Sequence, residues 1–320
     1  MKLATKLLFT LLLSSNAYAV TNGTSVNWNN YQDMVEMSCT GTVIAGKFVL
    51  TAAHCTHDDR IRFSDNTIVS SIDRVNHPDW NLSGAQIDVS LWSLPKTRNS
   101  AQIHYFADLT KNTVKNNDKL RLFGFGTTNN ADEPLHYATV NANLEPIRPQ
   151  MIDGQFIGQG QGVGGDSGGA WLNNNNEIVA TVKSGANSIT FGTNLHYAKD
   201  FILENINGWH YPTLANTFNG STTIKVQSLH DPLSGQVNDM AYTSGEATIT
   251  GGTCFQASDI QPFSTCTYTV ESQGTGTLHL SDSESITIKP TPESGGGDSG
   301  GSLGLLSLIG LLGLGLIRRK

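Results

Sequence analysis

Two copies of one five-residue run, Gly-Asp-Ser-Gly-Gly, are the part of the sequence best suited to covalent chemistry. The first copy spans 165–169 and the second spans 297–301. Glycines beside a serine let backbone amides approach a reacting carbonyl, and a serine becomes a nucleophile when a base takes its proton. A solvated linker can carry the same letters, so the surroundings of Ser167 and Ser299 must decide between them.

The surroundings of the first copy suit a rigid catalytic loop. Ser299 lies in 291–301, where proline, glycine and serine dominate, and such a stretch behaves as a flexible linker that cannot hold donors in place. Ser167 is followed by an apolar run at 170–172, an asparagine turn at 173–176 and a second apolar run at 177–182. This pattern predicts a β-hairpin that fixes the loop, so we assign the chemistry to Ser167.

The elements around this loop are predicted to be mostly strands. Short apolar or alternating runs between 42 and 182, separated by clusters of Asn, Asp, Gly and Ser, predict an antiparallel all-β body. The apolar positions of 198–206 recur at helical spacing, and Gly208 is placed to end that helix. Residues 213–290 are rich in Thr and Ser and predict a small β-sandwich.

The two ends of the chain are predicted to serve export. Lys2 and Lys6, an apolar run and the sequence Ala-Tyr-Ala at 17–19 indicate a signal peptide that is cleaved after residue 19. Residues 302–320 are apolar with a basic end, and they are short for a membrane span, so we expect at most a minimal anchor. The predicted organisation is therefore a signal peptide at 1–19, a large β-domain at 20–212, a small β-sandwich at 213–290, a linker at 291–301 and a tail at 302–320.

Charge and cysteine content narrow the function further. Between the two ends the chain has 15 basic and 27 acidic residues, which excludes nucleic acid and anionic membrane surfaces as partners of this part of the chain. Four cysteines in an exported chain favour two disulfides. Three connectivities are open from sequence alone, and we favour the local pairs, Cys39 with Cys55 and Cys254 with Cys266.

Four motifs occur in an order that resembles the chymotrypsin-like (trypsin-like) serine endopeptidases. They are TAAHC at 51–55, DVSLWSL from Asp88, LFGFGTT at 122–128 and GGDSGGAW at 164–171. The resemblance covers roughly residues 20–209, and the 16-residue spacing of Cys39 and Cys55 is similar to the disulfide of the family's histidine loop. It implies two six-stranded antiparallel barrels with the catalytic groove between them, closed by the helix near residue 198.

The resemblance also implies catalytic roles for individual residues. His54 would be the general base and then the general acid, because an imidazole titrates near neutrality. Asp88 would orient His54, Ser167 would form the acyl-enzyme, and the amides of Gly165 and Ser167 would form the oxyanion hole. The simpler alternatives are a packed core histidine, a strand-end cap and turn glycines. His57 lies close to His54 in sequence, but nothing at metal-ligand spacing accompanies the pair, so we expect neither a metal nor another cofactor.

A further expectation concerns the new amino terminus. Cleavage after residue 19 would expose Val20 and the sequence Val-Thr-Asn-Gly, which is similar to the activation sequence of the family. The resemblance implies that this terminus pairs with Asp166. Signal peptidase alone would then activate the protein, whereas the alternative is a frayed terminus at Val20 with Asp166 as a loop cap.

Specificity in the resembled family is set six residues before the nucleophile, which is Gln161 here. A trypsin-like preference for Lys or Arg requires a carboxylate there, so we do not expect trypsin-like specificity. The substrate strand would include Gly185, and Leu195 would form a wall that narrows the pocket. Val163 stands where many relatives have a cysteine, so one pocket disulfide is missing.

The tail and the substrate leave alternatives open. Glycines at 295–297 and 300–301 before the apolar segment resemble GlyGly C-terminal sorting signals, which a rhomboid-type protease removes during export to the cell surface or medium. The alternative is an anchor that stays in the inner membrane facing the periplasm. We expect protein or peptide substrates; the competing functions are an esterase-like processing hydrolase and a catalytically silent surface protein that binds through residues 213–290.

Overall fold

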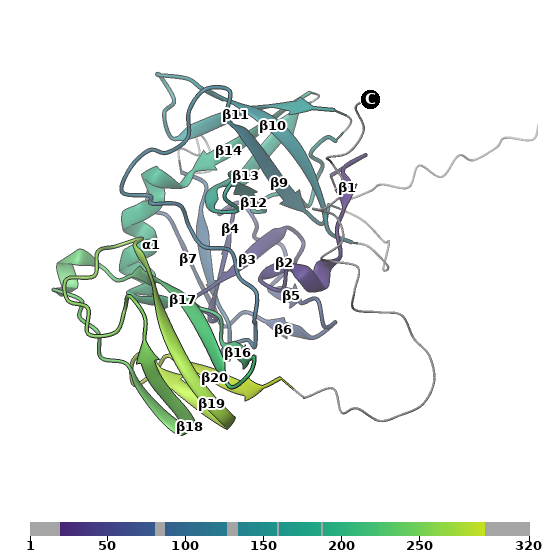
Figure 1. Ribbon diagram of the computed structural model, residues 1–320. Helices are drawn as coiled ribbons and strands as arrows, with labels where there is room; N and C mark the ends of the chain where they lie inside the picture. The colour runs from purple at the N-terminus through teal and green to yellow at the C-terminus, as the bar shows by residue number, and fades with distance from the viewer. Residues whose placement is uncertain (1–19, 81–86, 127–133, 159, 187, 292–320) are drawn as a thin grey trace, which may run out of the picture. The chain divides into compact units, whose positions relative to one another are not determined.

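The structure is a computed structural model that describes residues 20–80, 87–126, 134–158, 160–186 and 188–291 (Figure 1). The described chain up to Pro290 belongs to one compact unit and consists mainly of antiparallel strands. The predicted signal peptide, most of the linker and the whole tail lie outside the described residues. None of the helices formed by the described residues is long and apolar enough to cross a membrane.

The first sheet places the strands that precede His54 and follow Asp88 next to each other. Its order is β6-β5-β2-β3-β4-β8-β7. The edge strands β6 and β7 are separated only by Ser71 and Ile72, whose amides bond to the carbonyls of Asp59 and Ser93. One bent chain segment therefore links the two edges, and the barrel has six strands if β6 and β7 are counted as one. The bounds are β2 (Met34–Glu36), β3 (Thr40–Ile44), β4 (Phe48–Thr51), β5 (Arg60–Arg62), β6 (Ile68–Ser70), β7 (Asp73–Asn76) and β8 (Ser90–Ser93).

The second sheet is a closed barrel of six strands. Its order is β10-β11-β14-β13-β12-β9, and pairing of β9 with β10 closes the ring, while the short strand β1 adds to β10. Alternating burial along β10 matches a strand with one face toward a core. The predicted all-β double barrel is confirmed by these two sheets. The bounds are β1 (Thr24–Ser25), β9 (Lys119–Gly124), β10 (His136–Leu144), β11 (Met151–Ile157), β12 (Ala170–Leu172), β13 (Ile178–Ala186) and β14 (Ile189–Asn194).

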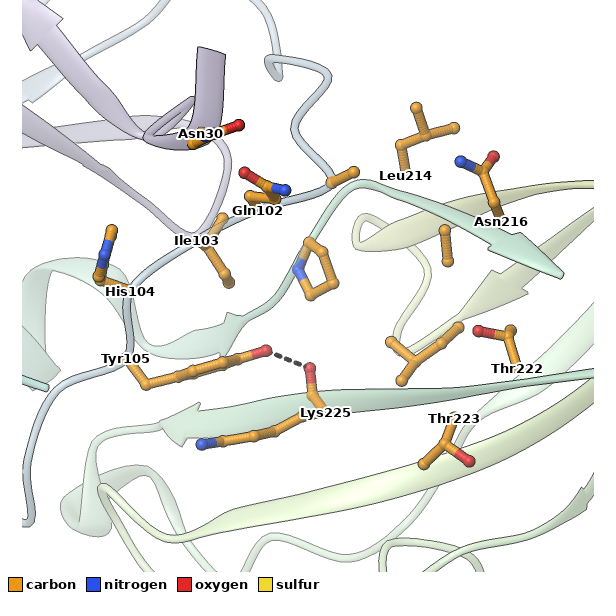
Figure 2. Close-up of a pocket in the computed structure, with 14 residues that line it drawn as sticks. Asn30, Gln102, Ile103, His104, Tyr105, Leu214, Asn216, Thr222, Thr223 and Lys225 are labelled. Atoms are coloured by element: carbon orange, nitrogen blue, oxygen red, sulfur yellow. Dashed lines mark hydrogen bonds between the residues drawn. The ribbon is translucent and has the colours of Figure 1, made fainter. Parts of the chain in front are cut away.

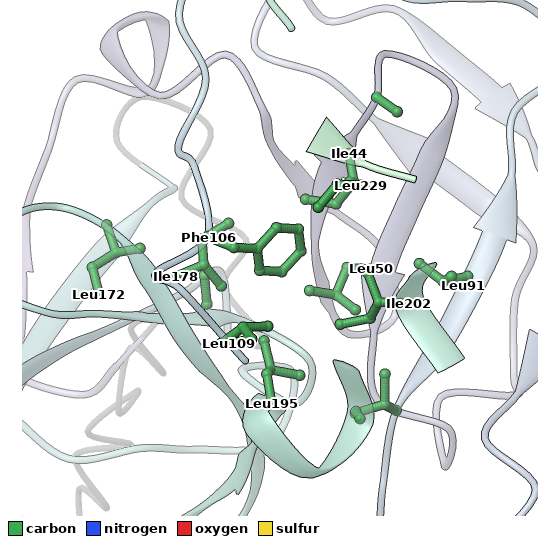
Figure 3. Close-up of a cluster of buried hydrophobic side chains, with 14 of the residues drawn as sticks. Ile44, Leu50, Leu91, Phe106, Leu109, Leu172, Ile178, Leu195, Ile202 and Leu229 are labelled. Atoms are coloured by element: carbon green, nitrogen blue, oxygen red, sulfur yellow. The ribbon is translucent and has the colours of Figure 1, made fainter. Parts of the chain in front are cut away.

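A shared hydrophobic core joins the two barrels (Figure 3). Leu50 of the first barrel and Ile178 of the second belong to it, together with Phe106 from the segment between the barrels. Leu195 is also fully buried in this core. The expectation that Leu195 lines the substrate pocket is therefore wrong, because the turn η2 (Leu195–Ala198) directs this side chain into the core.

The predicted helix is present as α1 (Lys199–Ile206), and it buries Phe201 and Ile202 as expected. Its end differs from the prediction. Asn207 adopts the left-handed conformation and its amide bonds to the carbonyl of Leu203, so the last helical residue is Ile206 and Asn207 caps the helix one residue before Gly208. A Cβ atom on Gly208 would lie 2.4 Å from Oε1 of Glu284, so the end of that side chain would have to shift.

The C-terminal strands form a third sheet around their own core. The long strand β19 pairs with β17 through its first half and with β20 through its end, while β18 runs along most of its length. The strands of this small β-domain are joined by continuous hydrogen bonding, and the disulfide Cys254–Cys266 links the segment after β18 to β19. The bounds are β15 (Gly208–His210), β16 (Leu214–Thr217), β17 (Ser221–Leu229), β18 (Tyr242–Gly251), β19 (Thr265–His279) and β20 (Ser285–Pro290).

Specific polar contacts fasten this sheet to the barrels. Nδ1 of the fully buried His210 accepts a bond of 2.9 Å from the Ala45 amide, and its Nε2 lies 2.9 Å from the carbonyl oxygen of His104. Burial lowers the pKa of His210 to about 4, so its ring stays neutral near pH 7. Nearby, a cavity of about 560 Å³ separates 101–105 from β16 and β17, and the hydroxyl of Tyr105 donates to the carbonyl of Lys225 across it (Figure 2).

Candidate active site

His54 and Asp88 come together because they follow and precede two paired strands. His54 lies in the turn after β4, Asp88 lies just before β8, and Thr51 pairs with Ser90 across the ladder. The distance from His54 Nδ1 to Asp88 Oδ2 is 2.6 Å, and the His54 amide donates to Asp88 Oδ1 at 3.1 Å. The carboxylate is 2% exposed and the imidazole 34%, so Asp88 holds Nδ1 from inside and directs Nε2 away from itself.

The second barrel carries Ser167 on a loop that packs against the segment containing His54. Ser167 lies in the turn before β12, and its carbonyl accepts a bond of 2.8 Å from the Thr40 amide. A Cβ atom on the next residue, Gly168, would lie 2.1 Å from Oγ1 of Thr51, three residues before His54. Sγ of Cys55 lies 3.9 Å from the Ser167 carbonyl oxygen. The serine loop is thus clamped against the histidine loop on both sides of His54.

The loop before Ser167 has the geometry of an anion site. Gly165 has φ +93°, and a Cβ atom there would lie 2.1 Å from the carbonyl oxygen of Gly126, so only glycine fits. Its carbonyl is fixed by Oγ1 of Thr40 at 2.8 Å. Within the described ranges, the amides of Gly165 and Ser167 are not donors in any hydrogen bond. Both amides are therefore available for a negatively charged oxygen.

Asp166 is a buried carboxylate inside this loop. It accepts amide hydrogen bonds from Val163 at 2.7 Å, Gly126 at 2.9 Å and Val20 at 3.4 Å. Burial raises the pKa of Asp166 to about 7, against the opposing effect of these amides. Among the described residues no Lys, Arg or His pairs with it. A positive charge at this position would therefore be strongly stabilised.

The structure brings Val20 to Asp166 while residue 19 still precedes it, so its nitrogen is a peptide nitrogen. Val20 is fully buried and has φ +35°, an unfavourable conformation for a β-branched residue. The next residue, Thr21, bridges to Gln161 at the edge of the serine loop. Val20 and Thr21, which we expect to begin the processed chain, thus contact the loop that carries Ser167.

The expected pocket residues are placed in part. Gln161 is exposed, and its amide bonds to the Thr21 carbonyl. Between the segment after Gln161 and the substrate strand lies Thr190, a residue that the motifs did not indicate. Its Oγ1 would lie 3.7 Å from a Cβ on Gly162 and 3.8 Å from a Cβ on Gly185, and it bonds to the carbonyl of Ser184. Thr190 is thus positioned between the two chain segments that were expected to form the pocket.

The cysteines near His54 do not make a metal site. Ligand atoms of Cys39, His54 and Cys55 lie within 4.8 Å of one another, which is close enough to hold an ion. The two sulfurs are joined in the disulfide Cys39–Cys55, so neither can serve as a thiolate ligand. This bridge and Cys254–Cys266 are the two local pairs favoured from sequence.

The double barrel and the paired His54 and Asp88 are features of the chymotrypsin-like serine proteases. In agreement, the sequence profile of the Trypsin family matches residues 17–202, which is more than half of the chain. The chain belongs to the trypsin family. It is therefore a protease, and its substrates are proteins or peptides.

The chain is also similar to solved structures at low sequence identity. The Vibrio cholerae VesB protease is 17% identical with a TM-score of 0.49, over 85% of this chain and 99% of that one. HL collagenase is 19% identical with a TM-score of 0.47, over 57% and 97%. A mutant of human heparin binding protein is 16% identical with a TM-score of 0.50, over 58% and 97%. No curated protein sequence matches the chain.

Proposed function

We propose that this protein is an exported serine endopeptidase that cleaves peptide bonds through His54, Asp88 and Ser167. The observation that carries the proposal is the 2.6 Å contact of His54 with a buried Asp88, beside a Ser167 loop clamped to the same segment. A carboxylate in this position stabilises the imidazolium that forms when His54 takes up a proton.

Catalysis would follow from this arrangement in two stages. Oγ of Ser167 attacks the substrate carbonyl carbon while its proton passes to Nε2 of His54, and Asp88 stabilises the resulting imidazolium. The amides of Gly165 and Ser167 donate hydrogen bonds to the carbonyl oxygen as its negative charge develops. The carbon–nitrogen bond then breaks and the leaving amine takes the proton from His54. Water releases the acyl group by the same steps, with His54 again as the base.

We also propose that removal of the signal peptide activates the enzyme. Two features support this step: Asp166 is buried without a cation among the described residues, and the backbone of Val20 is strained next to it. Cleavage after residue 19 converts the Val20 nitrogen into an ammonium group and frees its φ angle. The new ion pair would then hold the oxyanion loop in place.

The pocket supports an uncharged residue before the scissile bond. Gln161 carries an amide where trypsin-like cleavage requires a carboxylate, and the neighbouring Thr190 is fully buried with its hydroxyl bonded to the Ser184 carbonyl. Neither residue supplies a negative charge for Lys or Arg, so we favour a small or polar side chain and do not propose trypsin-like specificity. Profiling the processed enzyme against a peptide library measures this preference directly.

Export and tail processing remain proposals that rest on the sequence. The residues after Thr291 lie outside the described ranges, and so does the signal peptide. Mass spectrometry of secreted protein tests both ends together. A chain that starts at Val20 and ends near Gly301 supports signal peptidase and a rhomboid-type sorting protease as processing partners, whereas an intact tail supports a membrane anchor.

Peptide cleavage by matched variants tests the proposed chemistry. His54→Ala and Asp88→Asn should each reduce turnover by at least about ten-thousandfold, since triad members act as a unit. His57→Ala is the control, because His57 is an exposed histidine three residues away. The fold alone does not exclude a binding function, because a protein named for heparin binding shares it. Equal turnover by all three variants would show that hydrolysis does not depend on His54 and Asp88. No turnover by the processed wild type would leave the silent binding protein as the better explanation.

A further inference from the structure

A second concave surface lies in the C-terminal sheet, and none of its lining residues belongs to the candidate active site. It encloses about 530 Å³ between the end of α1, strand β15, the segment 230–242 and the turn 280–282. We call it the Trp209 cavity. The lining residues used below are Trp209, His230, Asp231, Met240, Tyr242 and Asp282.

The apolar part of the Trp209 cavity is more exposed than folding alone requires. Trp209 is buried beneath it, with its ring perpendicular to that of His230 at 5.0 Å. At the rim, Met240 is 80% exposed and Tyr242 is 47% exposed. Tyr242 is nevertheless held in place, because one face stacks on His279 at 4.5 Å. Exposed methionine and fixed aromatic rings around a hollow are typical of surfaces that bind a partner.

The charged side chains that line the Trp209 cavity are all acidic. Asp231 and Asp282 line it, and no Lys or Arg is among the lining residues. Burial lowers the pKa of His230 to about 4, so this ring adds no positive charge near pH 7. Asp231 also caps the turn η3 (Pro232–Ser234) through the Leu233 amide. The carboxylate of Asp282 is exposed and has no hydrogen-bond partner among the described residues, so it is available to a cation.

We propose that the Trp209 cavity binds a basic, apolar segment of a polypeptide, with a lysine or arginine side chain placed between the carboxylates of Asp231 and Asp282. The charged end would also meet the free face of Tyr242, where a cation is attracted by the ring. The aliphatic stem of that side chain and its apolar neighbours would pack on Met240 and Trp209. This site would bind a protein partner away from the scissile bond, and the binding does not depend on Ser167.

Binding of a labelled peptide to the inactive, processed Ser167→Ala chain tests this site. The probe is a fluorescein-labelled hexapeptide of alternating leucine and lysine, and its counterpart has glutamate in place of lysine. We expect fluorescence anisotropy to show binding of the lysine peptide alone. Raising the salt concentration from low to high should weaken it, because exposed charges are screened.

Matched variants in the same background locate the binding surface. Asp282→Asn should weaken binding about threefold, as expected for one exposed ion pair. Tyr242→Ala should weaken it about tenfold, as an aromatic anchor does. The controls are Glu271→Gln and Phe218→Ala, which remove an exposed carboxylate and an exposed aromatic ring outside the cavity. Thermal unfolding checks that each variant is folded; Met240→Ala, at an exposed position, is a second rim variant that should also weaken binding.

Three results would overturn the proposal. The first is equal binding of the lysine and glutamate peptides, or no binding of either. The second is the same affinity in the cavity variants as in the two controls. The third is a concentration-dependent dimer that Met240→Ala abolishes, since a second copy of the chain would then occupy the cavity. Because the protein carries Ser167→Ala throughout, none of these outcomes bears on hydrolysis.

Discussion

The buried carboxylate of Asp166 should make stability depend on where the chain begins. We compare two forms: one starts at Val20, and the other keeps a single alanine before it. In the extended form Asp166 has no ammonium partner, and burial raises its pKa to about 7 from an ordinary value of 3.8. The folded state then holds its proton more tightly than the unfolded state does. The contribution of Asp166 to stability is therefore fully present below about pH 4 and is lost as the pH rises to about 7.

The size of this effect follows from the two pKa values. A difference between about 7 and 3.8 corresponds to about 4 kcal/mol of unfolding free energy lost between those pH values. In the form that starts at Val20, the ammonium group offsets the buried negative charge and removes most of that loss. The substitution Asp166→Asn should have different effects in the two forms. In the form that starts at Val20 it should lower the free energy of unfolding by about 3 kcal/mol or more, because it leaves the buried ammonium without a partner. In the extended form above pH 7 it should be nearly neutral, because it removes a buried charge and weakens one amide contact.

Urea unfolding at pH 5 and pH 8 measures both the loss of stability with rising pH and the effect of Asp166→Asn. The four proteins are the two forms, each with aspartate and with asparagine at 166. Titration of His210 affects all four equally, so it cancels in the comparison. If Asp166→Asn changes the free energy of unfolding by the same amount in both forms at both pH values, the proposed ion pair with Val20 does not exist.

Three further predictions concern other parts of the molecule. Gly165→Ala should lower kcat/KM at least about a hundredfold, because its Cβ would collide with Gly126 and displace an oxyanion donor. The control is Gly158→Ala, at a similar φ with open space around it. Equal losses of kcat/KM in the two variants would refute the assignment of the oxyanion hole. His210 should destabilise the fold by about 3 kcal/mol as the pH falls from 6.5 to 4, because its pKa of about 4 means that only the unfolded chain takes up the proton. Acid unfolding of His210→Gln should lack this dependence, and an unchanged acid profile would contradict the reasoning. Replacing Cys254 and Cys266 with serine should lower the free energy of unfolding by about 3 kcal/mol, as expected for a short closed loop; an unchanged urea midpoint would show that the bridge adds nothing.

The sequence was sufficient for the double barrel and for residues whose neighbours in the chain fix their position. His54 follows β4 directly and Asp88 precedes β8, so pairing of two short apolar runs is enough to bring them together. Ser167 is similar, because the hairpin of β12 and β13 after it was visible as two apolar runs with an asparagine turn. For these three residues, the local sequence pattern already predicts the strand pairing that positions them.

The predictions for individual residues failed where the direction of a side chain depends on the pairing register of strands that are distant in the sequence. A bulge between Val182 and Ser184 shifts the pairing of β13 with β14, and a simple count along the chain cannot anticipate it. Leu195 was therefore expected in the pocket although it lies in the core. Thr190 was missed because its place depends on β14 pairing with both β11 and β13. Asn207 ends the helix in place of Gly208 because asparagine also tolerates the left-handed conformation.

The most direct test of the central claim is covalent labelling of the processed protein with a fluorophosphonate, followed by mapping of the modified residue. The reagent reacts only with a serine whose proton a neighbouring base removes. The account predicts labelling of Ser167, which disappears in Ser167→Ala and persists in Ser299→Ala. Labelling at Ser299, or no labelling of correctly processed protein, would contradict it.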